Sequence, residues 1–380
     1  MPPDSESILI TGATGYLGGL AVATALTRGH ERLVLPLRDP TAWDTVVGRV
    51  AAELEAGGRP LTPEDRERMI PVTLPPTDRL GELLPVLREH RVRDVLHCAG
   101  CLSYFNVRQL QEGNIDLTRE FVRLSQDLDV RRFLFVSTAY SSGFTDEIIP
   151  EALHESPGAD PTDYTRTKRE AEQVVAGSGL SYVIVRPSIV IGDDRDGRYS
   201  GKAYGVYQLW HAYDRFVAKT NPTIVHLVAS DAPINFLHQN AFTNALWAAY
   251  RELPDDTIVH VVSRDEGLPS LRGSWERVLT QYGSIEEVHF YPSLDRVPTK
   301  DMSRRMRFWN EFTSINMEIG SAHWRFDTRV LDGLRHAGLS FADCTYETFA
   351  TCQERYFRDY PKAFAARLPD AAPLRFVVHD

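Results

Sequence analysis

Three glycines near the N-terminus constrain the fold more than any other feature of the sequence. Gly12, Gly15 and Gly18 lie in LITGATGYLGG, directly after an apolar segment and at the start of a helical pattern. Glycines in this context permit a tight turn, close approach of the backbone to a pyrophosphate and close packing of helix on strand. The segment therefore predicts a dinucleotide site. The expected contacts here are Thr11, Gly12, Thr14, Gly15, Tyr16, Leu17 and Gly18.

Short apolar segments alternate with longer helical patterns in the first half of the chain. The expected strands are SILIT (7–11), RLVLPL (32–37), MIPVTL (69–74), DVLHCA (94–99), RFLFVS (132–137), YVIVRP (182–187) and TIVHVVS (257–263). This alternation of strand and helix patterns predicts an α/β fold: a Rossmann-type doubly wound parallel sheet with a smaller, interleaved mixed α/β C-terminal substrate domain. We expect the NADP-binding Rossmann domain to comprise 1–194 and 225–265, and the substrate-binding region 195–224 and 266–380.

Charge and composition argue against several classes of function. The 380 residues carry a formal net charge of −10, which disfavours a nucleic-acid partner because phosphate neutralisation needs a basic surface. The sequence has neither an apolar stretch of about 18 residues nor a secretory signal, so we expect a cytoplasmic protein without a membrane span. Four cysteines are too few for a disulfide framework. Cys98 and Cys101 form one C-x-x-C without a second pair, so no metal site is expected.

The end of the second expected strand indicates the cofactor. An acid at this position bonds the ribose 2′-hydroxyl of NAD, whereas an arginine accommodates the 2′-phosphate of NADP. The segment LVLPLRDP offers Arg38 first and Asp39 second. Because Arg38 stands at the strand end, the sequence favours NADPH.

A tyrosine and a lysine lie one helical turn apart in YTRTK. Tyr164 and Lys168 would share a helix face, and Lys168 is one of only five lysines. A nearby ammonium lowers the pKa of a phenol from its usual value of about 10, so Tyr164 could exchange a proton near neutral pH. Ser137 and Thr138 end the fifth expected strand, and Asn114 precedes it. Such donors can bind a carbonyl oxygen and protonate it as hydride arrives.

Four segments resemble the extended short-chain dehydrogenase/reductases: TGATGYLG, LHCAG, YTRTK and RPSIVIG, in matching order from residue 7 to about 265. Within that family, FVSTAY, PLRD and RPSIVIGD are most similar to the male-sterility-type branch, which contains fatty acyl-CoA reductases and thioester reductase domains. The resemblance implies an NADPH-dependent oxidoreductase. It would reduce an acyl thioester to an aldehyde, with reduction either stopping there or continuing to the alcohol.

The resemblance also implies roles for individual residues. Thr138, with Ser137 as the second choice, takes the position of the hydroxyl residue that hydrogen-bonds the substrate carbonyl, and Tyr164 that of the proton donor. Lys168 would bind the nicotinamide ribose and tune the tyrosine. Asn114 would help to hold the helix and a proton-relay water. The remaining expected cofactor contacts are Cys98, Ala99, Gly100, Ser137, Pro187, Ser188 and Ile189.

The sequence departs from this branch in two respects. After the third strand, TLPPTDRL has prolines and then Asp78 where the branch usually has a Gly-Asp pair, so the adenine contacts stay open. Adenylation and carrier domains, which are fused to many thioester reductases, are not recognisable. We therefore expect a thioester to arrive in trans, on an acyl or peptidyl carrier protein or on CoA.

Aromatic residues after the sixth strand could wall an apolar acyl channel, or they could be ordinary core residues. The candidate substrate residues are Ser103, Phe105, Tyr204, Tyr207 and Trp210. Two other functions stay open. One is an NADP-dependent ketone or alcohol oxidoreductase acting on a sterol-like, β-keto or nucleotide-sugar substrate. The other is a cofactor-sensing regulator, although such proteins typically lack the Tyr-Lys pair.

Overall fold

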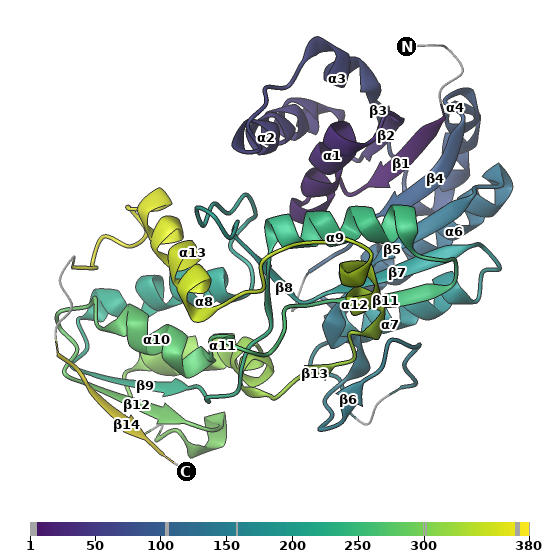
Figure 1. Ribbon diagram of the computed structural model, residues 1–380. Helices are drawn as coiled ribbons and strands as arrows, with labels where there is room; N and C mark the ends of the chain where they lie inside the picture. Colours follow the sequence, from purple (N-terminus) through teal and green to yellow (C-terminus); the bar gives the residue numbers. More distant parts are fainter. Residues whose placement is uncertain are drawn as a thin grey trace.

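A seven-stranded parallel sheet forms the larger part of the computed structural model (Figure 1), which describes residues 6–102, 106–156, 159–298, 300, 302–368 and 373–379. Each strand pairs in parallel with its neighbours. In spatial order the strands are β11 (Thr257–Val261), β7 (Tyr182–Pro187), β5 (Arg132–Val136), β4 (Val92–His97), β1 (Ser7–Thr11), β2 (Arg32–Leu37) and β3 (Met69–Thr73). They coincide with the seven expected segments, so the predicted Rossmann-type sheet is confirmed.

Helices cover both faces of this sheet because successive strand residues enter two different hydrophobic cores. In β2, Leu33 and Leu35 belong to one core and Val34 to the other. The first core includes residues of α1 (Tyr16–Arg28), α2 (Trp43–Ala56), α9 (Gln239–Glu252) and α12 (Arg329–His336). The second includes residues of α4 (Leu84–Glu89), α6 (Leu117–Leu128) and α7 (Asp163–Ala176). The sheet is therefore doubly wound and buried on both sides.

A smaller part of the molecule has its own hydrophobic core. Three parallel strands form its sheet, in the order β14 (Arg375–Val378), β12 (Glu287–Tyr291) and β9 (Ile224–Val228). Figure 1 shows this sheet and the C-terminus at the opposite end of the molecule from the N-terminus. The helices of this core are α8 (Val206–Phe216), α10 (Leu271–Leu279), α11 (Arg304–Ser321) and α13 (Tyr346–Asp359).

The chain passes between the two parts more than once, which is the interleaving that the sequence predicts. It leaves through β8 (Ile189–Ile191) and returns through β10 (Phe236–His238), and these two strands pair with each other. Strand β9 lies in the smaller sheet, whereas α12, later in the chain, packs on the large sheet through Leu331 and Leu334. The numerical domain limits drawn from the sequence stay a prediction.

Short elements complete the architecture. The segment around Asn114 forms a π-helical turn, η3 (Gln111–Asp116), which continues into α6, and π turns are frequent at functional sites. The other short elements are α3 (Pro63–Arg68), α5 (Val107–Leu110), β6 (Ile148–Ile149), β13 (Arg325–Phe326), η1 (Pro40–Ala42), η2 (Thr77–Leu83), η4 (Ala139–Ser142), η5 (Ala218–Thr220) and η6 (Leu294–Arg296). Across the described ranges, no helix combines the length and apolar character needed to cross a bilayer.

Candidate active site

A cavity of about 430 Å³ lies at the carboxyl-terminal ends of the strands of the large sheet. Its wall contains part of the glycine loop, residues that follow β4, β5 and β7, the first turns of α7, the segment before α8, and part of α11. Leu209, Phe236 and Leu271 also line it and belong to the core of the smaller part. The cavity therefore reaches from the strand ends, where open α/β sheets bind ligands, into an apolar region.

The glycine loop between β1 and α1 is shaped for close backbone contacts. Gly12 has a φ of +76°, and a Cβ on it would lie 2.8 Å from the backbone nitrogen of Ala99. The backbone N–H of Gly15 donates to the carbonyl of Gly12 at 2.8 Å. The first turn of α1 contains no acidic residue, so no carboxylate there competes for its positive end. These features fit the diphosphate of a dinucleotide.

Replacing Gly18 with alanine is expected to weaken binding of a nicotinamide dinucleotide by at least about tenfold, because the new Cβ would lie 2.1 Å from the carbonyl oxygen of Gly12. The backbone of the loop would have to move. Gly48→Ala in α2 is the matched control, since nothing lies within 4 Å of its added Cβ. That change should stabilise the helix by about 0.5–1 kcal/mol. Fluorescence titration with NADPH checks the affinities, and equal affinities in the two variants would contradict this role of the loop.

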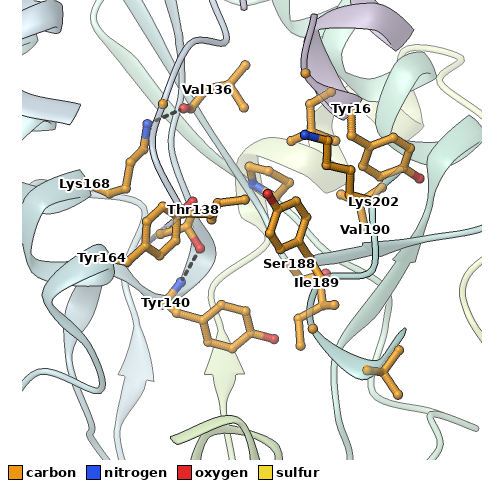
Figure 2. A pocket seen from close by; sticks show the side chains of 18 of the residues that line it. Tyr16, Val136, Thr138, Tyr140, Tyr164, Lys168, Ser188, Ile189, Val190 and Lys202 are labelled. Atoms are coloured by element: carbon orange, nitrogen blue, oxygen red, sulfur yellow. Dashed lines mark hydrogen bonds between the residues drawn. The ribbon is translucent and has the colours of Figure 1, made fainter. Parts of the chain in front are cut away.

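Helix α7 carries Tyr164 and Lys168 one turn apart, and both line the cavity. The helix begins with a capping box in which Thr162 Oγ1 accepts the N–H of Thr165 at 3.0 Å, and Thr165 Oγ1 accepts the N–H of Thr162 at 3.2 Å. This box fixes where the helix starts. Figure 2 shows Tyr164 and Thr138 directed toward the same part of the cavity.

The ammonium group of Lys168 is buried against the end of β5. Its Nζ donates to the carbonyl of Val136 at 2.8 Å (Figure 2) and lies 4.0 Å from the centroid of the Phe135 ring. Burial lowers the pKa of Lys168 to about 8, and the buried carboxylate of Glu172 opposes this shift. Lys168 is therefore still mainly protonated at pH 7 and places a positive charge one helical turn from Tyr164.

Three hydroxyl groups follow the ends of β5 and β7 in the cavity wall. Thr138 Oγ1 accepts the backbone N–H of Tyr140 at 3.4 Å. The hydroxyls of Ser137 and Ser188 are buried and have no hydrogen-bond partner within the described part of the chain. Because buried polar groups are ordinarily paired, these two hydroxyls fit a polar ligand in the cavity. Together with the glycine loop, they meet the requirements of a nicotinamide dinucleotide.

Asn114 is buried behind the cavity, in η3. Its side-chain oxygen accepts the N–H of Cys101 at 2.7 Å, and its amide donates to the carbonyl of Cys101 at 3.2 Å. The same amide donates to Thr167 Oγ1 at 3.0 Å. Thr167 lies on α7 next to Lys168, so Asn114 ties the segment after β4 to this helix.

His97 connects the Asn114 region to the strand that precedes the glycine loop. Its Nδ1 lies 2.9 Å from Thr11 Oγ1, and its Nε2 lies 3.1 Å from Thr118 Oγ1. The hydroxyl of Thr118 donates to the carbonyl of Asn114 at 2.6 Å, and that of Thr11 accepts the N–H of Ala99 at 3.1 Å. The ring must therefore carry its proton on Nε2. Burial lowers the pKa of His97 to about 3, which keeps it neutral.

The structure divides the expected site residues into several sets. The cavity wall includes Thr14, Gly15, Tyr16, Leu17, Gly18, Cys98, Gly100, Ser137, Thr138, Tyr164, Lys168, Pro187, Ser188, Ile189 and Tyr204. Outside that wall lie Thr11, Gly12, Ala99, Asn114 and Arg38, the last of them exposed just after β2. Tyr207 and Trp210 are buried in the core of the smaller part. Ser103 and Phe105 lie outside the described residues.

Several residues of the wall were not anticipated from the sequence. They include Arg49, Tyr140, Tyr199, Lys202, Asn316, Ile319 and Gly320. The ring of Tyr199 packs edge-on against Tyr16, with 4.8 Å between centroids, and so holds the segment before α8 near the glycine loop. The presence of a rare lysine in RYSGKAYGVY could have drawn attention to Lys202, whereas no local signal distinguishes the residues of α11.

The charged side chains among the described lining residues are cationic: Arg49, Lys168 and Lys202. Arg49 donates to the carbonyls of Thr14 and Gly15 at 2.5 and 2.8 Å, beside the glycine loop. The charge of the cavity is thus opposite in sign to the net charge of the chain, −10. Such a concave cationic surface attracts anionic ligands.

Comparisons with known proteins agree with this site. The family described as Male sterility protein, an NAD-binding domain, matches residues 10–239. Fatty acyl-CoA reductase 1 of Mus musculus is 27% identical over 229 residues, which cover 49% of this chain and 44% of the mouse protein. The chain therefore matches less than half the length of that relative.

Solved structures share the fold at low sequence identity. The terminal R domain from the myxalamid PKS-NRPS biosynthetic pathway has a TM-score of 0.70 and 18% identity, covering 95% of this chain and 92% of its own. A thiolation-reductase di-domain from an archaeal non-ribosomal peptide synthetase has a TM-score of 0.68 and 16% identity, and the match covers 95% of this chain and 78% of the di-domain. The UDP-Glc/GlcNAc 4-epimerase of Campylobacter jejuni has a TM-score of 0.62 and 16% identity, and the match covers 94% of this chain and 99% of the epimerase. Because the family match spans more than half of the chain, this chain belongs to the male sterility protein family of NAD-binding domains, a branch of the extended short-chain dehydrogenase/reductases.

Proposed function

We propose that the chain is an NADPH-dependent reductase of acyl thioesters. The observation that carries this proposal is a single cavity that combines the glycine loop, the side chains of Thr138, Tyr164 and Lys168, and an apolar extension. Membership of the male sterility family, and relatives named fatty acyl-CoA reductase, support a thioester as the substrate. The similarity to reductase domains of biosynthetic assembly lines supports the same choice.

In this proposal, the cavity residues hold the cofactor and place the thioester carbonyl beside it. The glycine loop holds the diphosphate, Lys168 binds the nicotinamide ribose, and Pro187 and Ser188 line the nicotinamide pocket. When bound, the reduced cofactor supplies the hydride for the carbonyl carbon. Gly15 and Gly18 of the loop lie in the wall of the cavity, as do Lys168, Pro187 and Ser188.

Tyr164 is the proposed proton donor to the carbonyl oxygen, and Thr138 is its proposed hydrogen-bond donor. General-acid catalysis of this kind contributes about 10²–10⁴-fold to a rate. The positive charge of Lys168 favours the phenolate that remains after proton transfer. Cleavage of the carbon–sulfur bond then releases a thiol and leaves an aldehyde.

Arg38 is the proposed contact for the cofactor 2′-phosphate. It follows β2 directly and is exposed. In an NAD enzyme, Asp39 would bind a ribose hydroxyl. Here its Oδ1 already accepts the N–H of Thr41 at 2.9 Å and the hydroxyl of Thr41 at 2.6 Å. These hydrogen bonds lower the pKa of Asp39. We therefore propose NADPH rather than NADH.

Arg38→Ala is expected to raise the dissociation constant of NADPH by about 10–100-fold and to leave that of NADH within about twofold. A charge-assisted hydrogen bond to a phosphate is worth about 1.5–3 kcal/mol, and only NADPH carries this phosphate. Arg93→Ala, at an exposed position of β4, is the matched control and should change neither constant. Titration of each variant with NADPH and with NADH measures the dissociation constants. An equal loss of affinity for the two dinucleotides in Arg38→Ala would count against NADPH specificity through Arg38.

A carrier protein or CoA is the proposed source of the thioester. Both carry the acyl group on a phosphopantetheine arm, whose phosphate suits a cavity with cationic and no acidic side chains among its described lining residues. The thiolation-reductase neighbour supports a carrier protein, and the relatives named acyl-CoA reductases support CoA. We propose that either can deliver the substrate.

A second candidate function is reduction of a ketone, or oxidation of an alcohol, on a sterol-like, β-keto or nucleotide-sugar substrate. The observation in its favour is the shared fold of a nucleotide-sugar epimerase. Purified protein offered acyl-CoA and acyl-carrier thioesters, aldehydes, ketones and nucleotide sugars, with NADPH consumption followed by absorbance, distinguishes the two. Consumption with thioesters supports the leading proposal, and consumption with ketones or nucleotide sugars alone supports the second.

A further inference from the structure

Helix α11 reaches the cavity near its C-terminal end, through Asn316, Ile319 and Gly320. Gly320 is buried, and a Cβ added to it would lie 3.3 Å from Cδ2 of Leu271 and 3.4 Å from Cδ1 of Ile234. Leu271 and Ile234 line the same cavity and are only 1% and 4% exposed. Glycine at position 320 therefore lets α11 pack closely against Leu271 and Ile234 in a buried, apolar part of the cavity wall.

Backbone geometry does not require a glycine at this position. Gly320 has no positive φ, and the residue that caps α11 is Ala322. A glycine inside a helix is less favourable than alanine by about 0.5–1 kcal/mol. An added Cβ would touch only the ends of two flexible side chains, in contrast to the backbone contacts at Gly18. Glycine therefore permits close packing of α11 at this point, and a larger residue would have to displace the lining side chains of Leu271 and Ile234.

The wall of the cavity leads from the proposed reaction centre to Gly320. The backbone N–H of Tyr140 donates a hydrogen bond to Thr138 Oγ1 (Figure 2). The ring of Tyr140 packs in a hydrophobic cluster with Ile319. Ile319 precedes Gly320 on α11. Burial raises the pKa of Tyr140, so its ring remains uncharged. An acyl group whose carbonyl lies at Thr138 can thus extend its hydrocarbon end past Tyr140 toward Gly320.

We propose that Gly320, opposite Leu271 and Ile234, sets the maximum length of the aliphatic acyl chain that this enzyme reduces. This inference rests on the proposed function and narrows its substrate to thioesters with an apolar, unsubstituted chain end. A polar group at that end would lose its hydration among these apolar side chains. One methylene that fits or fails to fit an apolar pocket changes kcat/KM by about tenfold or more.

The test measures kcat/KM for saturated straight-chain acyl-CoA thioesters of increasing length, with the parent protein and three variants. Gly320→Ala and Gly320→Val should lower kcat/KM for the longest accepted chains, by about tenfold or more for valine, and leave shorter chains within about twofold. Leu271→Val should shift the limit toward longer chains. Gly333→Val, where nothing lies within 4 Å of an added Cβ, is the control and should keep the parent profile.

The possible outcomes separate this inference from the proposed function. If the parent oxidises NADPH with none of the thioesters, the proposed function falls and the inference falls with it. If the parent reduces them and Gly320→Val binds NADPH normally but keeps the parent length limit, only the inference is overturned. If Gly320→Val does not fold, Gly320→Ala and Leu271→Val decide, and an unchanged limit in both rejects the role of Gly320.

Discussion

Replacing Tyr164 with phenylalanine is expected to lower kcat for thioester reduction by about 10²–10⁴-fold, with a change in NADPH affinity of less than about threefold. The variant keeps the ring and loses only the proposed acid. Its side chain lies in the cavity with Thr138, on a helix whose start is fixed by a capping box. Steady-state kinetics with an acyl thioester and fluorescence titration with NADPH measure the two quantities.

Tyr140→Phe provides a matched comparison in the same cavity. The hydroxyl of Tyr140 donates to the carbonyl of Asn235 at 3.2 Å, and burial raises the pKa of Tyr140, so it is unsuited to release a proton near neutral pH. We expect kcat of this variant to stay within about tenfold of the parent. A similar loss in both variants would show that Tyr164 has no special role.

Replacing Glu172 with glutamine is expected to lower the free energy of unfolding by about 3–5 kcal/mol, because it leaves a buried guanidinium without its counter-charge. Arg186 on β7 and Glu172 on α7 have side chains that are 0% and 1% exposed. Arg186 Nε and Nη2 donate to the two carboxylate oxygens at 3.0 and 2.7 Å. Glu172 lies one turn after Lys168, so the pair also fixes α7 to the sheet. Urea-induced unfolding at neutral pH measures the change.

The exposed pair Arg108–Glu112 supplies the control for this prediction. Its side chains are 87% and 52% exposed, although Arg108 Nε lies only 2.7 Å from Glu112 Oε1. Solvent screening reduces the value of such a pair, so Glu112→Gln should change the free energy of unfolding by less than about 1 kcal/mol. Comparable small losses in both variants would mean that the buried pair does not stabilise α7.

Features that depend on nearby residues were predictable from the sequence. Most strands of the large sheet are buried on both faces, so they appear in the sequence as short, largely apolar segments, whereas the edge strand β3 is partly exposed. Gly12, Gly15 and Gly18 form the expected loop at the start of α1, and Tyr164 and Lys168 share α7. In each case the geometry follows from chain spacing of a few residues.

Features that depend on distant residues were not predictable in this way. From the sequence alone, Tyr204, Tyr207 and Trp210 are equally good candidates for contact with a substrate. In the structure, Tyr204 precedes α8 and lines the cavity, whereas Tyr207 and Trp210 are buried in the core of the smaller part. Helix α8 is buried around most of its circumference, so its periodicity does not show which face meets a ligand. Gly320 enters the wall only because α11 folds back from more than 100 residues beyond Pro187.

The most direct test of the proposed function follows the hydride itself. Purified protein is supplied with an acyl-CoA thioester and NADPH that carries deuterium at the transferable position, and the product is analysed by mass spectrometry. We expect deuterium on the former thioester carbonyl carbon of an aldehyde or alcohol, and little product from Tyr164→Phe in the same time. Release of free acid without deuterium, or deuterium transfer to ketones and not to thioesters, would contradict it.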